Sequence, residues 1–143
     1  MTLGVVGTGG RGAGACNDSL TINDNVRLIA MGNLRPEKAA EKRDILKEAH
    51  GDKVQVEDRN IFGGLEAYEA IIDHPDVDCV LLTTSPGFRP WHIERAVDAV
   101  ARELGVEPGT VRRRNFIRKG QLPFTTAMNW TYDSGDFAAL LQK

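Results

Sequence analysis

Residues 3–12 consist of Leu-Gly-Val-Val-Gly-Thr-Gly-Gly-Arg-Gly, a short apolar run followed directly by a glycine-rich turn. The run Leu3–Val6 predicts a β-strand, and the small residues after the turn predict a helix over Ala13–Leu20. In such a unit Gly7 permits the tight turn, Gly9 lets the backbone approach a pyrophosphate, and Gly12 lets the helix pack close to the strand. The stretch therefore predicts the first βαβ unit of a dinucleotide-binding fold. The alternative is a glycine turn with a structural role only.

Strand-like and helix-like segments alternate after this turn, up to a glycine at position 105. This alternation predicts right-handed βαβ crossovers and a parallel sheet. The fold class expected is α/β: a truncated Rossmann-type sheet of about four strands in the order 3-2-1-4 with flanking helices, followed by an irregular C-terminal tail. The expected strands are Leu3–Val6, Val26–Met31, Lys53–Glu57 and Val77–Thr84, and the later helices are Pro36–His50, Leu65–Asp73 and Pro90–Leu104.

The end of the second expected strand bears on the choice of cofactor. An acidic residue at this place usually accepts hydrogen bonds from the ribose hydroxyls of NAD, but here Asn33 occupies the position. An amide does not repel a 2′-phosphate, and Arg35 lies close enough in sequence to pair with one. Both NAD and NADP are therefore expected cofactors. The alternative is that Asn33 is a turn residue and Arg35 a solvated charge.

The bulk composition is that of an ordinary globular domain. The chain has 143 residues, 41% of them hydrophobic and 27% charged, with a formal net charge of −2. This charge balance argues against nucleic-acid or anionic-membrane partners, and no apolar run approaches the roughly 20 residues that span a bilayer. Cys16 and Cys79 lack metal-ligand spacing, so we expect reduced core thiols, no metal site and a cytoplasmic protein without a leader.

The order of these motifs resembles the glucose–fructose oxidoreductase/inositol dehydrogenase (Gfo/Idh/MocA) family, over residues 1 to about 98. Members follow their fourth strand with a loop near the cofactor and then a helix that carries a histidine, matched here by His92. The resemblance implies an NAD(P)-binding domain. The motifs that support it are Gly7–Gly12, Gly32–Pro36, Asp78–Thr84 and Pro86–Ala96.

The resemblance also implies which residues meet the cofactor. Thr84, Ser85 and Pro86 would lie beside it at the carboxyl ends of the strands. His92 is expected to cap or pack its helix rather than act as a catalytic base. The complete set of cofactor-binding residues implied is Gly7, Thr8, Gly9, Gly10, Arg11, Gly12, Asn33, Arg35, Thr84, Ser85 and Pro86.

The chain departs from this family after about residue 98. Members continue into a fifth strand with a Glu-Lys-Pro motif, which this sequence lacks, and into a substrate domain, which is also missing. Hydride transfer needs a substrate held against the nicotinamide and away from water. We therefore expect no catalytic residue here and no activity by this chain alone, although the resemblance is to an oxidoreductase.

The last segment, residues about 100–143, resembles part of the molybdenum-binding subunit of the xanthine dehydrogenase/aldehyde oxidase family. In that family this stretch is a connecting piece, and the cofactor loops and catalytic glutamate lie outside it. We expect a fusion, with a dinucleotide-binding domain at 1–99 and a helical or irregular tail at 100–143. A divergent single-family protein is the alternative. The motifs that support the resemblance are Ala101–Pro108, Val111–Ile117, Leu122–Thr126 and Thr131–Asp136.

These expectations combine into one functional hypothesis with two alternatives. The hypothesis is an NAD(P)-binding fragment of an oxidoreductase. The alternatives are a non-functional fusion fragment, or the cofactor-binding half of an enzyme that a partner chain completes. Because a fifth strand is missing, the fourth strand is expected to be an exposed edge, which predicts marginal stability or self-association.

Overall fold

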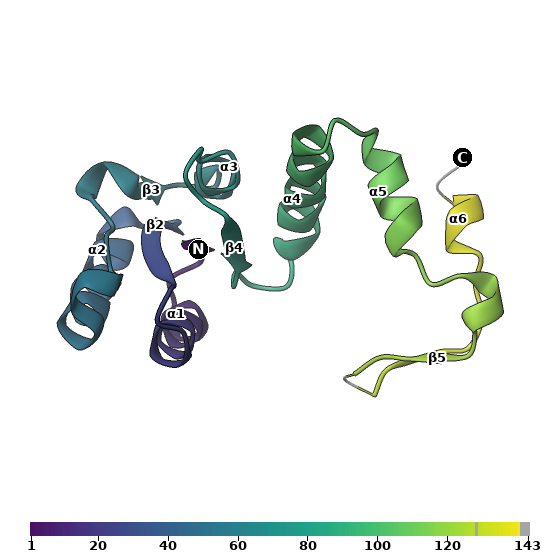
Figure 1. The fold of residues 1–143 in the computed structure, drawn as a ribbon, viewed down its shortest axis with the longest axis horizontal. Coiled ribbons are helices and arrows are strands. Elements are labelled where there is room, and N and C mark those ends of the chain that lie inside the picture. The colour runs from purple at the N-terminus through teal and green to yellow at the C-terminus, as the bar shows by residue number, and fades with distance from the viewer. Residues whose placement is uncertain (128, 141–143) are drawn as a thin grey trace. The chain divides into compact units, whose positions relative to one another are not determined.

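The computed structural model describes residues 1–127 and 129–140, and its chain forms two compact units, Met1–Ala96 and Val97–Lys143 (Figure 1). Each unit is described by itself below. The boundary between the two family resemblances, expected at residues 99 and 100, stays a prediction.

The first unit is a four-stranded parallel sheet with helices on both faces, as the sequence predicts (Figure 1). The strand order is β3-β2-β1-β4, so the expected order is confirmed. The strands are β1 (Thr2–Val6), β2 (Arg27–Asn33), β3 (Ile61–Gly63) and β4 (Cys79–Leu82). The α-helices that begin in this unit are α1 (Gly10–Ile22), α2 (Pro36–His50), α3 (Ala67–Ile72) and α4 (Arg89–Glu103).

Two apolar clusters fill the two faces of the sheet. The larger cluster joins β1 and β2 to α1 and α2, and Cys16 and Leu20 of α1 are fully buried in it. The smaller cluster lies on the opposite face, where Ile71 of α3 packs against Val6 and Ala30. Along β1, Leu3 and Val5 point into the larger cluster and Val6 into the smaller one, as the two-residue period requires. Along β2 the register shifts after Leu28, so the consecutive residues Ile29 and Ala30 both contribute to the smaller cluster.

The third strand lies later in the chain than the sequence predicts. Lys53–Glu57 does not form a strand: Val54 makes a single parallel bridge to Leu28, between two 3₁₀ turns at Gly51–Lys53 and Asp58–Asn60. Val54 and Val56 are buried, which explains the misleading apolar pattern. Burial alone does not produce a ladder of hydrogen bonds, and the ladder with β2 forms at β3 instead.

Strand β4 pairs with β1 on one side only, and within the described residues no strand pairs with its outer side. Its four residues are all half-buried. The fourth strand is therefore an edge of the sheet, as the sequence predicts.

The second unit is built from short elements, in agreement with the irregular tail expected. Gly105, at φ 63°, follows α4, and the Glu107 side chain caps α5 (Pro108–Asn115) by accepting from the N–H groups of Gly109 and Thr110 at 2.7 and 2.9 Å. The remaining elements are a 3₁₀ turn (Lys119–Gln121), an antiparallel pair β5 (Phe124–Thr125) and β6 (Thr131–Tyr132), and the short α6 (Phe137–Leu140).

Candidate binding crevice

The glycine turn between β1 and α1 is close-packed at two of its glycines and open at two others. Gly7 adopts φ 91°, and a Cβ there would lie 2.9 Å from the Thr84 backbone nitrogen. A Cβ on Gly12 would lie 1.9 Å from the Gly7 carbonyl oxygen. Gly9 and Gly10 have nothing within 4 Å of such a carbon. Packing thus explains Gly7 and Gly12, whereas Gly9 and Gly10 leave the backbone open to an approaching group.

Thr83, which the sequence analysis does not single out, holds this turn in place through hydrogen bonds. Its hydroxyl lies 2.9 Å from the Val6 carbonyl oxygen and 2.7 Å from that of Gly7, and its backbone N–H donates to Val6. The residue follows β4 directly, so the end of one strand holds the turn of its neighbour. A threonine after an apolar strand was the only signal available in the sequence.

Asn33, at the end of β2, is engaged in hydrogen bonds within the protein. Its Nδ2 donates to the hydroxyl of Thr8 at 2.6 Å, and its Oδ1 accepts from the backbone N–H of Arg35 at 3.1 Å. Thr8 is buried and Arg35 is exposed. These bonds make Asn33 a turn residue that ties the β1 end to the β2 end, and they compete with any hydroxyl of a ligand.

The loop after β4 leads into α4. The Thr84 carbonyl accepts from the Nε of Arg89 at 3.0 Å, and the Ser85 carbonyl accepts from the N–H of Phe88 at 3.0 Å. Ser85 and Pro86 are exposed. Of the three residues expected beside a cofactor, only Thr84 lies among those that line the crevice described next.

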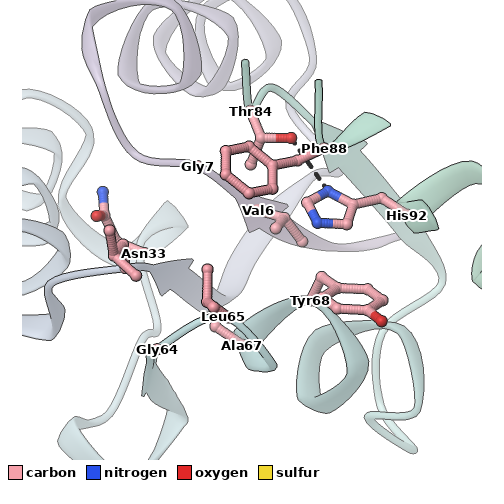
Figure 2. A pocket seen from close by; sticks show the side chains of 11 residues that line it. Val6, Gly7, Asn33, Gly64, Leu65, Ala67, Tyr68, Thr84, Phe88 and His92 are labelled. Atoms are coloured by element: carbon pink, nitrogen blue, oxygen red, sulfur yellow. Dashed lines mark hydrogen bonds between the residues drawn. The ribbon is translucent and has the colours of Figure 1, made fainter. Parts of the chain in front are cut away.

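A cavity of about 90 Å³ opens at the carboxyl ends of the strands, beside the glycine turn (Figure 2). Because β1 lies between β2 and β4, this is where the direction of strand addition reverses, the usual ligand position in open α/β sheets. Its lining comes from the ends of β1 and β2, the segment from Gly64 to α3, and the start of α4. The lining residues are Val6, Gly7, Asn33, Leu34, Gly64, Leu65, Ala67, Tyr68, Thr84, Phe88 and His92.

His92 forms the polar wall of this crevice. It is 5% exposed, its ring stacks on Tyr68 at 4.3 Å between centroids, and its Nδ1 lies 3.0 Å from the Thr84 hydroxyl. Burial lowers the pKa of His92 below 6.5, so the imidazole is neutral at neutral pH. Figure 2 shows the other ring nitrogen turned toward the space that the labelled side chains enclose. The histidine packs its helix as expected, but it also faces the crevice.

No cluster of three or more His, Cys, Asp or Glu side chains within residues 1–127 and 129–140 is arranged to hold a metal ion. In the same described ranges no helix is both long and apolar enough to cross a membrane.

The comparisons with known proteins point to a different enzyme class from the one that the glycine turn suggests. No protein-family model matches the chain. The chain is 47% identical over 51 residues to the carbon monoxide dehydrogenase large chain of Hydrogenophaga pseudoflava, and 35% identical over 53 residues to that of Afipia carboxidovorans. The matches cover 36% and 37% of this chain, which spans only 6% and 7% of the relatives.

These matches correct the assignment made from the first hundred residues. Both relatives are named as large chains of carbon monoxide dehydrogenase, and they give no support to the Gfo/Idh/MocA resemblance. The function as an NAD(P)-binding fragment of that family, and NAD or NADP as cofactor, are therefore wrong. The resemblance of the tail to the molybdenum-binding subunit is supported in part. The glycine motif misled because it specifies a backbone turn, not the ligand beside it.

Proposed function

We propose that this chain serves as a non-catalytic component of an oxidoreductase assembly of the carbon monoxide dehydrogenase kind. The observation that supports this is the 47% identity over 51 residues to a protein named as the large chain of that enzyme. The matched length of 51 residues is slightly longer than the second unit, Val97–Lys143, and we infer that the match covers this unit and a few residues before it. A chain called large belongs to an enzyme with further chains, so partner chains are expected.

The molybdenum centre itself does not fit this chain. The described residues provide no group of metal-ligating side chains, and the second unit has no buried histidine or cysteine. We derive no chemical step through molybdenum, and the proposed contribution of the second unit is structural.

The second unit has the surface of a segment that a larger protein covers. Phe137 contacts Phe116 and Tyr132 at centroid distances of 6.3 and 6.0 Å, which forms a small aromatic cluster. In the same unit, Trp130 is 70% and Leu140 is 69% exposed. Large apolar side chains that remain exposed in one piece of a chain are typical of surfaces buried by neighbouring structure.

A segment exchange tests this proposal. The matched 51 residues of the Hydrogenophaga pseudoflava large chain are replaced by the aligned residues of this chain, and assembly and carbon monoxide dehydrogenase activity are measured. We expect the exchanged enzyme to assemble and to keep activity within about tenfold, and the same exchange with Trp130→Ser to assemble poorly. A scrambled segment of equal composition serves as control. Failure of the exchanged enzyme to assemble, with the scrambled segment no worse, would refute the proposal.

For the first unit we propose a second function, the binding of a phosphate-bearing ligand at the glycine turn. The first N–H groups of α1 have no acceptor within the helix, and no side chain caps them. Gly9 and Gly10 leave the backbone open, and the exposed Arg11 adds a positive charge. A helix N-terminus of this kind favours anions. The remaining residues proposed around the ligand are Gly7, Thr8, Gly12, Asn33, Arg35, Thr84, Ser85 and Pro86.

Titration of the full chain with pyrophosphate, followed by amide NMR shifts, tests this function. We expect saturable shifts at the turn that Gly9→Val abolishes, because a side chain there covers the open backbone, while its Cβ has no protein atom within 4 Å. Gly14→Ala is the matched control, since Gly14 lies on the same helix and also has free space around it. Equal binding by the Gly9→Val variant would exclude the turn as the phosphate site.

We also propose self-association through the outer edge of β4. Its backbone is unpaired on that side within the described residues, and its side chains are apolar. An unprotected edge of this kind offers N–H and C=O groups to a strand of a second copy.

A further inference from the structure

The cavity beside the glycine turn combines a largely apolar lining with one accessible polar side-chain atom. Exposed apolar side chains gather at its mouth: Leu34 is 62%, Leu65 is 60% and Phe88 is 48% exposed. Val6 lies deeper and is buried. Apolar surface concentrated around one opening indicates that the occupant is itself largely apolar where it enters.

The polar atom is Nε2 of His92. Within the described part of the chain the Nδ1 atom has the Thr84 hydroxyl as partner, and every buried side-chain nitrogen or oxygen has a hydrogen-bond partner. Since Nε2 forms no hydrogen bond with these residues, it is accessible from the cavity rather than enclosed by protein. Stacking on Tyr68 fixes the plane of the ring, and Figure 2 shows this nitrogen facing the enclosed space. An accessible nitrogen on a ring that is otherwise buried and held in place can exchange its hydrogen bond with water for one with a ligand atom.

We propose that this cavity binds a monocyclic, pyrimidine-sized heteroaromatic ring, and that the Nε2 of His92 forms a hydrogen bond with the edge of that ring. This inference rests on the phosphate-binding function proposed above, which accounts for the part of the ligand outside the ring. Gly7 lines the cavity and begins the glycine turn, so a substituent of the bound ring leads directly to the proposed phosphate position.

The size of the cavity limits the ring. Its volume of about 90 Å³ is below the roughly 150 Å³ of a cavity that encloses benzene completely. One six-membered ring therefore enters with its outer edge at the mouth, against Leu65 and Phe88. A purine, with two fused rings, leaves more apolar surface in water and binds less tightly.

Three probes separate the ring from the phosphate: uridine has the ring only, pyrophosphate has the phosphate only, and UDP has both. Each is titrated into the full chain, with adenosine as the size control, and NMR shifts of His92 and of the glycine turn are followed. We expect uridine to shift the His92 ring signals, pyrophosphate to shift the turn, and UDP to bind more tightly than either. Adenosine is expected to bind at least threefold more weakly than uridine.

Variants test the role of the nitrogen. His92→Phe keeps an aromatic ring on Tyr68 but removes Nε2, and we expect it to weaken uridine about fivefold to tenfold, the usual effect of one hydrogen bond, while pyrophosphate binds unchanged. Phe88→Ala is expected to weaken uridine similarly through lost contact. Ile93→Ala, an exposed neighbour outside the cavity, is the matched control and should change nothing.

The outcomes distinguish the two proposals. Binding of uridine without pyrophosphate would leave the ring site standing and refute the phosphate site. Binding of pyrophosphate without uridine up to millimolar concentration would refute the ring site alone. Unchanged uridine affinity in a folded His92→Phe variant would overturn the role of Nε2.

Discussion

The contrast between two glycines of one helix gives the sharpest test of the structure. A Cβ at Gly12 would lie 1.9 Å from the Gly7 carbonyl oxygen, 3.0 Å from the Gly7 carbonyl carbon and 2.7 Å from the Thr83 hydroxyl. The first two atoms belong to the backbone and cannot rotate away. Gly12→Ala must therefore push α1 from the turn, at an overpacking cost of about 1–3 kcal/mol, and it weakens the Thr83 hydrogen bonds by about 1 kcal/mol more.

Gly14→Ala adds the same methyl group to the same helix, two residues later, where nothing lies within 4 Å. Because alanine is the better helix former, this variant should gain about 0.5–1 kcal/mol. Thermal unfolding followed by circular dichroism measures both. With about 4–8 °C of midpoint shift per kcal/mol for a domain of this size, the two variants should differ by at least about 10 °C. Equal midpoints for the two variants would show that α1 does not pack against the turn as described.

Three further predictions concern acidity, thiol reactivity and the sheet edge. Since burial lowers the folded-state pKa of His92, the unfolded chain binds the proton at a higher pH than the folded chain does. The urea midpoint of unfolding should therefore fall as the pH drops below 6.5. The variant His92→Phe should show a smaller fall. Burial raises the pKa of the Cys16 thiol to about 12, so a thiol reagent at pH 8 should modify it only as fast as the protein unfolds, and rapid modification would contradict its burial. Thr83 donates its backbone N–H to β1, so by the alternation along a strand the N–H of Val80 faces the outer edge. Val80→Pro removes that donor and should weaken the self-association measured by ultracentrifugation. An unchanged association constant would exclude the β4 edge as the interface.

The sequence was sufficient for the strand order because its signals are local and repeated. The glycine turn fixes the first βαβ unit, and Pro36 and Gly51 mark both ends of α2. The third strand was predicted too early in the chain because Val54 and Val56 are apolar and buried. Val54 makes only one β-bridge, so the segment does not form a ladder of hydrogen bonds. Periodicity reports which residues are buried, and only pairing decides which of them form a strand.

The candidate site was predictable only where it depends on the backbone. The glycine turn follows from its place between a strand and a helix, whereas Thr84 was implied by the family resemblance. The contact of Tyr68 with His92 was not, because α3 and α4 meet only in the folded chain and no spacing in the sequence signals it. The cofactor was wrong for a further reason: the turn geometry accepts many anions, and the groups that choose among them lie elsewhere.

The hydroxyl of Thr83 has a thermodynamic consequence. It joins the end of an edge strand to the turn proposed to hold phosphate, so whatever orders β4 also orders the turn. Linkage makes such a relation reciprocal. A strand that pairs with β4 would raise the affinity of the turn for its ligand. The bound ligand would raise the affinity of β4 for that strand by the same factor. Strand pairing and ligand binding would then be two parts of one cooperative equilibrium.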